Sequence, residues 1–407
     1  MSFLNSHSDG KKMVDKVFKA AVKAKQAKLE VGDDAVVDAT LGTLFDEHGT
    51  FVAFDSVWNS FQSLSNIQKA KYAAGIQGNP TFRKAVYTWL FGDTDIPCEI
   101  IATPGGAGAV SSTIKNVLNP GDTLVKPHIA WGPYNTMANE FQVNTMNYEL
   151  FDGDQFNCGS FLATCQQVMN EQGKVLAIIN DPCHNPSGYT MTSDEWDTIL
   201  HGLTQLSHQG PVIILHDIAY VDFSTTPEWK SHFQKYQQLS HNMMVVIAFS
   251  LSKTFTAYGM RVGAAVAISS NMEELVKFRD AEIYSARSIW STVNNSVMDL
   301  FTMITTTPSM REEYLAEKTT YVDIIKQRAD IFIEEAKDVG LPLYPYKEGF
   351  FATIKVAQDQ VEYLGEQLQK HHIYTVEVAH GLRIALCSVP KHKLYGLAQR
   401  IKTIIEQ

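Results

Sequence analysis

The chain has few cysteines and no long hydrophobic run. Its 407 residues include five cysteines, an odd number with no Cys-x-x-Cys pair. This argues against a disulfide framework or a zinc cluster and fits a reducing compartment. The longest apolar runs fall far short of the roughly 20 residues that a membrane helix needs, and no apolar stretch follows a charged start at the N-terminus. We therefore expect a cytoplasmic protein with no membrane partner and no metal site.

Positive charge is also scarce. Lys and Arg total 34 against 44 Asp and Glu, which gives a formal net charge of −10. A general nucleic-acid binder draws most of its affinity from neutralising phosphates, so this balance argues against a nucleic-acid partner. Apolar residues make up 45% of the chain and charged residues 19%. That is ample apolar surface for a packed core, so disorder over most of the chain is not expected.

The N-terminal segment is rich in lysine between residues 11 and 28, at helical spacing. Its other face carries the apolar residues Val14, Val17, Phe18, Ala21 and Val22. Such a pattern is compatible with a basic helix on a membrane surface. Alanine dominates the segment and no tryptophan anchors it, so we favour a solvated helix that packs on the protein through one apolar stripe.

Short apolar segments alternate with helical stretches from about residue 80 to 270. The expected strands are 99–103, 123–126, 175–180, 211–215, 243–249 and 263–268. Several are continuous apolar runs, the pattern of strands that are buried on both faces. The sequence therefore predicts an α/β fold in which helices cover both faces of a mostly parallel sheet.

The pattern changes after about residue 272. Helical periodicity extends over 272–304 and 311–338, followed by strand-like segments at 350–356 and 382–387 and a closing helix over 392–406. We expect a large cofactor-binding domain over 45–312. A smaller α+β domain is expected from 13–44 and 313–407.

The most informative motif is Ser-x-Ser-Lys, with an arginine eight residues after the lysine. Ser250, Ser252, Lys253 and Arg261 follow an expected strand, and open α/β sheets bind ligands at the carboxyl ends of their strands. Hydroxyl groups and a guanidinium suit a phosphate. An amine in a desolvated or cationic site suits a Schiff base with an aldehyde. Taken alone, Lys253 is better explained as a surface amine in a turn.

Three other polar segments also follow expected strands. Asp217 could hold the proton of a pyridinium ring, or it could cap the following turn. Asn185 begins a tight Asn-Pro-Ser-Gly turn. A glycine-rich turn at 103–110 leads into a helix whose backbone N–H groups could face a phosphate. Its glycines do not have the G-x-G-x-x-G spacing of dinucleotide sites.

This combination resembles the class I aminotransferases, pyridoxal-phosphate enzymes of the aspartate and aromatic amino acid type, from about residue 36 to the end. The resemblance implies that Lys253 carries the cofactor as an internal aldimine and moves the proton at the substrate Cα. It also implies that Asp217 pairs with the pyridine nitrogen, that Asn185 and Tyr220 bind the phenolic oxygen, and that Trp131 stacks on the ring. The phosphate would be held by Gly106, Ala107, Ser250, Ser252 and Arg261.

The resemblance further implies a homodimer with shared active sites. Tyr72 would reach the phosphate of the neighbouring subunit, and Arg287 would bind the distal carboxylate of a substrate there. Arg383 would bind the substrate α-carboxylate, with Gly42 as a backbone contact. Trp131 and Asn185 would also border the substrate.

The chain departs from the family pattern at Ala107, where a threonine is usual, at Phe45, where the aspartate enzymes tend to carry a polar or basic group, and at Lys71, where they tend to carry asparagine. Phe45 favours an aromatic substrate and Arg287 favours a dicarboxylate. We expect an aminotransferase of aromatic or broad range that uses glutamate and 2-oxoglutarate in a ping-pong mechanism. The alternatives are an aspartate-specific aminotransferase and a pyridoxal-phosphate β-lyase or decarboxylase on the same scaffold.

Overall fold

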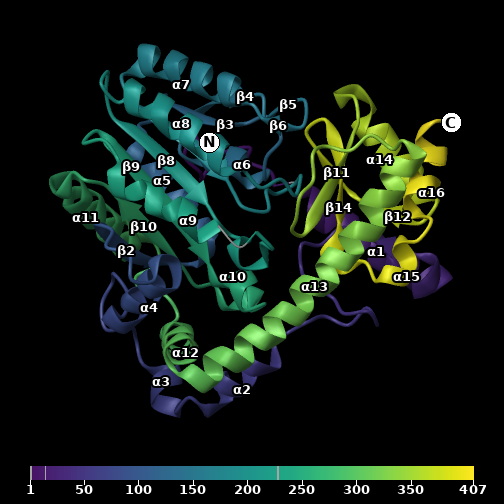
Figure 1. Ribbon diagram of the computed structural model, residues 1–407, viewed down its shortest axis with the longest axis horizontal. Coiled ribbons are helices and arrows are strands. Elements are labelled where there is room, and N and C mark those ends of the chain that lie inside the picture. Colours follow the sequence, from purple (N-terminus) through teal and green to yellow (C-terminus); the bar gives the residue numbers. More distant parts are fainter. Residues whose placement is uncertain (1, 14, 227–228) are drawn as a thin grey trace.

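A seven-stranded sheet forms the centre of the computed structural model, which describes residues 2–13, 15–226 and 229–407 (Figure 1). The strand order is β2-β10-β9-β8-β7-β3-β4. In that order the strands are Cys98–Thr103, Gly263–Ile268, Met243–Ser250, Val212–Asp217, Val175–Asn180, Thr123–Pro127 and Asn144–Tyr148. β10 pairs antiparallel with both of its neighbours, and the other pairs are parallel.

Helices cover both faces of this sheet, as predicted. Alternate residues of β9 show the two sides: Val246 and Ala248 pack in one buried cluster, whereas Val245 and Ile247 pack in another. The first cluster includes side chains of α5 (Gly105–Val117), α6 (Pro133–Glu140) and α11 (Met272–Ile289). The second includes side chains of α4 (Pro80–Phe91), α7 (Cys158–Gln172), α8 (Ser193–Leu206) and α12 (Asn295–Thr306). The predicted α/β class is therefore confirmed.

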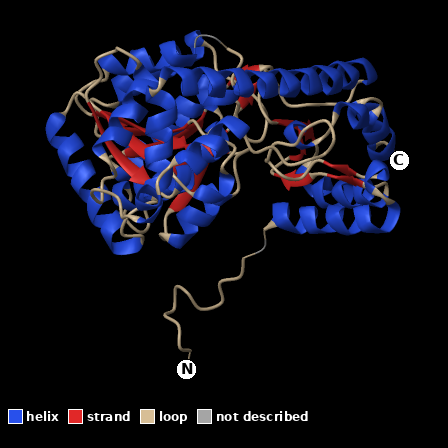
Figure 2. Cartoon of the chain, turned by 90° about the horizontal axis from the view of Figure 1, so that it is seen from below, coloured by secondary structure: helices blue, strands red, loops and turns tan. Residues whose placement is uncertain are grey.

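A second, smaller group of elements lies beside the main sheet, and α13 (Pro308–Val339) extends from one group to the other (Figure 1). Its antiparallel sheet has the order β11-β14-β13, and β1 pairs with β12 in a two-stranded parallel sheet. The strands are β1 (Val37–Asp38), β11 (Phe351–Lys355), β12 (Ile373–Tyr374), β13 (Val376–Val378) and β14 (Gly381–Ala385). The helices beside them are α1 (Lys16–Val31), α14 (Val361–Lys370), α15 (Lys391–Leu394) and α16 (Leu397–Ile405). Figure 2 shows that helices also enclose this smaller set of strands.

Two of the expected helices are interrupted. The helix expected over 272–304 is wrong, because α11 ends at Ile289 and α12 begins at Asn295. Ser291 adopts a left-handed backbone with φ 68°, and the side chain of Asn294 caps α12 by accepting from the Ser296 amide at 3.1 Å. The closing helix is also divided, with Gly396 at φ 74° between α15 and α16.

The N-terminal helix packs on the protein as expected, but through a different stripe. The buried residues of α1 are Ala20, Ala24 and Ala27, whereas Phe18 is 66% and Val22 68% exposed. The expected stripe is therefore wrong for these two residues, and Val14 lies outside the described residues. Alanine side chains allow the helix axis to approach its neighbours closely. In the part of the chain that the structure describes, every helix is too short or too polar to cross a membrane.

Candidate active site

A cavity of about 210 Å³ opens at the carboxyl ends of the central strands. It is lined by Gly106, Ala107, Trp131, Asn180, Asn185, Asp217, Ala219, Tyr220, Ser250, Ser252, Lys253, Tyr258 and Arg261. Every residue expected to contact the cofactor is in this set except Tyr72. The parallel arrangement of β7, β8 and β9 explains the convergence, since it brings the carboxyl ends of these strands to one edge of the sheet.

Lys253 lies in the short helix α10 (Leu251–Thr254), directly after β9. Its Nζ donates to the carbonyl oxygen of Gly42 at 2.6 Å and lies 4.5 Å from the centre of the Tyr258 ring. Burial is the main cause that lowers the pKa of Lys253 to about 8, and the positive charges of Arg383 and Arg261 act in the same direction. The amine therefore gives up its proton more readily than an ordinary lysine, as a nucleophilic amine requires.

Asp217 ends β8 and faces the cavity with a buried carboxylate. Its Oδ2 accepts from the Tyr134 hydroxyl at 2.6 Å, and its Oδ1 accepts from the Ala219 amide at 3.1 Å. Burial raises the pKa of Asp217, although both hydrogen bonds favour the ionised form. A carboxylate so placed can hold a protonated ring nitrogen.

A cup for a phosphate forms between the first turn of α5 and the turn around α10. Arg261 donates to the Ser252 hydroxyl at 2.8 Å and adopts a left-handed backbone with φ 53°. A Cβ at Gly105 would lie 2.5 Å from the Arg261 guanidinium, and one at Gly106 would lie 3.1 Å from the Ser250 Cβ. Glycine therefore lets the helix N-terminus approach the two serines and the arginine. Together these groups provide the hydroxyl, amide and guanidinium donors that bind a phosphate.

Arg383, on β14, reaches the cavity through Asn185. Its Nη1 donates to the Asn185 Oδ1 at 3.3 Å and its Nη2 to the Thr40 carbonyl oxygen at 2.6 Å. The guanidinium lies 4.3 Å from the centre of the Phe351 ring. Its buried Nε has no hydrogen-bond partner among the described residues. The guanidinium is thus fixed in position beside Asn185, a residue that lines the cavity.

Two predicted site residues lie apart from the cavity within the single chain. Tyr72 is 86% exposed, and the side chain of Arg287 donates to the Ser291 hydroxyl at 2.7 Å at the end of α11. Phe45, which favours an aromatic substrate in the sequence, is not among the residues that line this cavity. Phe45 packs edge-on against Phe51, at 5.9 Å between ring centres, and lines a separate small cavity near Lys28. The aromatic walls of the central cavity are Trp131, Tyr220 and Tyr258.

Sequence reasoning missed Asn180, Tyr134 and Tyr258. Asn180 pairs with Asp217 in strand register, and its side chain donates to the Asp217 carbonyl oxygen at 2.8 Å and accepts from the Asn185 amide at 2.7 Å. Its position at the end of an expected strand was the available signal. Tyr258 lies between Lys253 and Arg261 in the same turn, whereas Tyr134 reaches Asp217 through tertiary packing.

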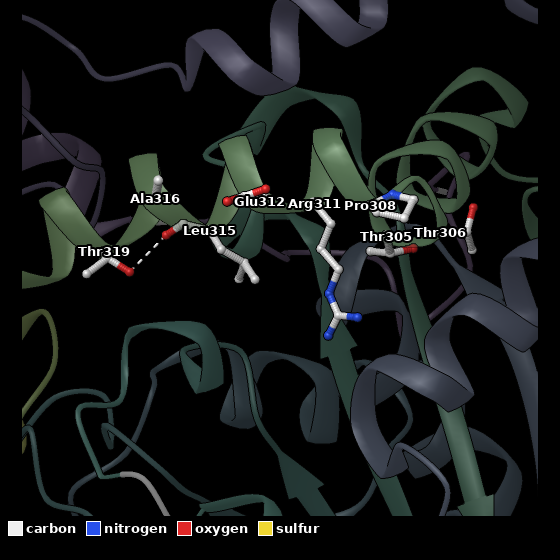
Figure 3. Close-up of a pocket in the computed structure, with 8 residues that line it drawn as sticks. All are labelled: Thr305, Thr306, Pro308, Arg311, Glu312, Leu315, Ala316 and Thr319. Carbon is white, nitrogen blue, oxygen red and sulfur yellow. Dashed lines mark hydrogen bonds between the residues drawn. The ribbon is translucent and has the colours of Figure 1, made fainter.

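A larger, open cavity of about 630 Å³ lies along α12 and α13, away from these groups (Figure 3). Figure 3 shows Arg311 and Glu312 pointing in different directions from α13. The hydroxyls of Thr305, Thr306 and Thr319 donate to carbonyl oxygens of their own helices. The central cavity is therefore the candidate active site, because an amine, a buried carboxylate and a set of anion-binding donors converge there at the carboxyl ends of the strands.

Comparison with known proteins gives concordant matches along most of the chain. Residues 40–401 match the family model for aminotransferase class I and II. The aspartate aminotransferase of Escherichia coli K12 is 23% identical over 344 residues, which cover 81% of this chain and 85% of that protein. The aromatic-amino-acid aminotransferase of Paracoccus denitrificans is 22% identical over 351 residues, covering 84% and 86%.

Solved structures agree with these matches. The crystal structure of an aminotransferase from Anaerococcus prevotii DSM 20548 superposes with a TM-score of 0.96 and 31% identity over 100% of both chains. The aromatic-amino-acid aminotransferase from Burkholderia pseudomallei, solved covalently bound to pyridoxal phosphate, gives a TM-score of 0.80 with 18% identity and covers 98% of this chain and 100% of that one. Because its identity is only 18%, the match to the Burkholderia pseudomallei structure shows a similar fold and no more.

Proposed function

The chain belongs to the class I and II aminotransferase family, and from this premise we propose that it transfers amino groups between amino acids and 2-oxo acids. Its amino acid substrates are aromatic or of a broad range, and glutamate and 2-oxoglutarate are the common pair. It is a transferase, and its cofactor is pyridoxal phosphate. When bound, this cofactor supplies an aromatic ring that accepts electrons from the bond broken at the substrate Cα. We expect a ping-pong mechanism.

The observation that carries the proposal is the arrangement of Lys253 and Asp217 around one cavity that also contains the phosphate cup. The cavity fits the cofactor because each part of the molecule meets a complementary group. The cup of Gly106, Ala107, Ser250, Ser252 and Arg261 would hold the phosphate, Asp217 would pair with the ring nitrogen, Asn185 and Tyr220 would bind the phenolic oxygen, and Trp131 would stack on the ring, since all of them line the cavity. Lys253 is the catalytic amine.

The residues have separate tasks at the substrate. Arg383 binds the α-carboxylate with its guanidinium, which lies beside Asn185, and the Gly42 backbone borders the same place. Lys253 then takes and returns the proton at the substrate Cα, a role that suits an amine with a pKa of about 8.

Substrate range depends on a neighbouring subunit. We propose a homodimer in which Tyr72 and Arg287 enter the partner's active site. The exposure of Tyr72, 86% in the single chain, supports this arrangement, because a large aromatic side chain gains from burial at an interface. Arg287 would bind the distal carboxylate of glutamate, while Trp131, Tyr220 and Tyr258 favour an aromatic side chain in the same cavity.

We divide the chain into a large cofactor-binding domain, 45–312, and a small domain, 13–44 with 313–407, a division supported by the separate buried cluster around β11, β12 and β14. We also place the enzyme in the cytoplasm, which fits its five unpaired cysteines.

The test is a substrate panel. Purified holoenzyme is incubated with 2-oxoglutarate and, in turn, phenylalanine, tyrosine, tryptophan, aspartate and alanine, and glutamate, ammonia and carbon dioxide are measured. Glutamate formation with the aromatic amino acids supports the proposal, and formation with aspartate alone favours the aspartate-specific alternative. Release of ammonia or carbon dioxide without glutamate identifies a lyase or decarboxylase. Parallel lines in double-reciprocal plots would support the ping-pong mechanism.

A further inference from the structure

The side-chain partner of Asp217 is a buried tyrosine. Tyr134 is 1% exposed, and its hydroxyl lies 2.6 Å from the Asp217 Oδ2. We infer that Tyr134 is a positioning residue that fixes the Asp217 carboxylate against the ring nitrogen of the cofactor. This inference rests on the role proposed above for Asp217.

The surroundings of Asp217 make this hydroxyl important. In the described part of the chain, no Lys, Arg or His forms an ion pair with Asp217. The carboxylate is therefore held by two donors, the Tyr134 hydroxyl on one oxygen and the Ala219 amide on the other. A hydrogen bond to an ionised acceptor is shorter and stronger than one between neutral groups. Loss of the hydroxyl would leave one buried carboxylate oxygen without its donor and free to turn away from the cavity.

The same tyrosine also supports the group expected to cover the ring. The rings of Trp131 and Tyr134 meet edge-to-face, with centres 5.3 Å apart and planes at 88°. Both residues are held at the start of α6, where the Tyr134 amide donates to the Trp131 carbonyl oxygen at 3.1 Å. One side chain thus contacts two of the groups that are proposed to hold the cofactor from different sides.

Two other buried tyrosines of the chain, Tyr148 and Tyr314, show a different pattern. Tyr148 is also 1% exposed, and its hydroxyl donates to the Ile178 carbonyl oxygen at 3.2 Å. Tyr314 donates to the Thr254 carbonyl oxygen at 2.7 Å. These hydroxyls satisfy backbone groups of the fold, whereas the Tyr134 hydroxyl meets an ionisable side chain that lines the cavity. Burial raises the pKa of Tyr134, so its hydroxyl keeps its proton and acts as a donor.

The test is a double-mutant cycle on cofactor binding. Apoenzyme is titrated with pyridoxal phosphate, and the dissociation constant is measured from the quenching of tryptophan fluorescence. Tyr134→Phe keeps the ring and removes the hydroxyl, and we expect it to weaken binding about tenfold. Asp217→Ala should weaken binding at least as much, and Tyr134→Phe should then have no further effect in the Asp217→Ala background.

The matched control is Tyr148→Phe, which removes a hydroxyl from an equally buried tyrosine and should leave the dissociation constant unchanged. A second readout is the visible circular dichroism of the cofactor at saturation. It should fall in Tyr134→Phe and not in Tyr148→Phe, because a loosely held carboxylate orients the ring less well. Thermal unfolding of each apoenzyme shows that the variants are folded.

The outcomes separate the inference from its premise. A Tyr134→Phe effect that keeps its size in the Asp217→Ala background would mean that Tyr134 acts through packing on Trp131, and it would overturn the inference. Unchanged cofactor binding in Tyr134→Phe would overturn it as well. Unchanged binding in Asp217→Ala would instead show that the proposed role of Asp217 is wrong.

Discussion

The Nζ of Lys253 donates a hydrogen bond of 2.6 Å to the carbonyl oxygen of Gly42, 211 residues away in the chain. The bond links α10, which follows strand β9 of the central sheet, to the segment that follows β1 in the smaller group of elements. A Cβ at Gly42 would lie 2.6 Å from the Phe351 Cζ, so the absence of a side chain allows the carbonyl to sit at this place. The amine is thereby held inside the cavity.

Lys253→Ala should abolish transamination and preserve the fold. The variant loses the amine that takes the proton at the substrate Cα, and the small side chain leaves the packing around α10 largely intact. The measurement is glutamate formation together with the visible absorption of the bound cofactor, which should lose its lysine-dependent band. Lys326→Ala, which removes an exposed lysine paired with Asp330 at 2.8 Å, is the control. Turnover in Lys253→Ala would contradict the assignment of the catalytic amine.

Arg287→Ala should raise the KM for glutamate and aspartate at least tenfold and leave that for phenylalanine nearly unchanged. Only the dicarboxylic substrates present a distal carboxylate to this guanidinium, and a charged hydrogen bond contributes about 1.5–3 kcal/mol. Steady-state kinetics with the three substrates measure the difference, with Arg311→Ala as a control for loss of an arginine elsewhere on a helix. Equal effects on all three substrates would mean that Arg287 has a structural role.

The site residues that lie at the carboxyl ends of strands could be predicted from the sequence. Asp217 and Lys253 directly follow continuous apolar runs, and such runs mark buried strands whose carboxyl ends meet at one edge. The antiparallel pairing of β10 leaves this edge intact, because its neighbours keep their direction.

The residues that were missed depend on tertiary contacts. Tyr134 reaches Asp217 because α6 packs on one face of the sheet, although the two residues are 83 positions apart in the chain. The break after α11 depends on the left-handed backbone of Ser291. Residues other than glycine rarely adopt this conformation, so the residue type does not predict the break.

Ala107→Thr should tighten binding of pyridoxal phosphate. Ala107 lines the cavity at the phosphate cup and offers only a methyl group, so a threonine adds a hydroxyl donor. One such hydrogen bond contributes about 1 kcal/mol, which corresponds to a roughly fivefold lower dissociation constant. Ala107→Val, which matches threonine in shape but has no hydroxyl, is the control. Equal affinity of the threonine and valine variants would show that the added hydroxyl does not reach the phosphate.

Glu282→Gln should stabilise the protein in alkaline buffer. Glu282 is fully buried on α11, where one carboxyl oxygen accepts from the Asn116 amide at 2.8 Å and the other has no partner among the described residues. Burial is the main cause that raises its pKa from 4.5 to about 7. The ionised form is therefore disfavoured in the folded state, and the contribution of Glu282 to the stability of the wild type falls as the pH rises from about 4.5 to 7 and then levels off.

The expected size of this loss is on the order of 3 kcal/mol, at 1.36 kcal/mol per pKa unit. Glutamine keeps the carbonyl oxygen that accepts from Asn116 and cannot ionise. The free energies of unfolding of the two proteins should thus be similar near pH 4.5, and the variant should be more stable above pH 7. Urea unfolding at both pH values measures the difference, and Glu273→Gln, at a carboxylate on the exposed start of the same helix, is the control. A stability difference between variant and wild type that does not change with pH would show that Glu282 is not the group that titrates.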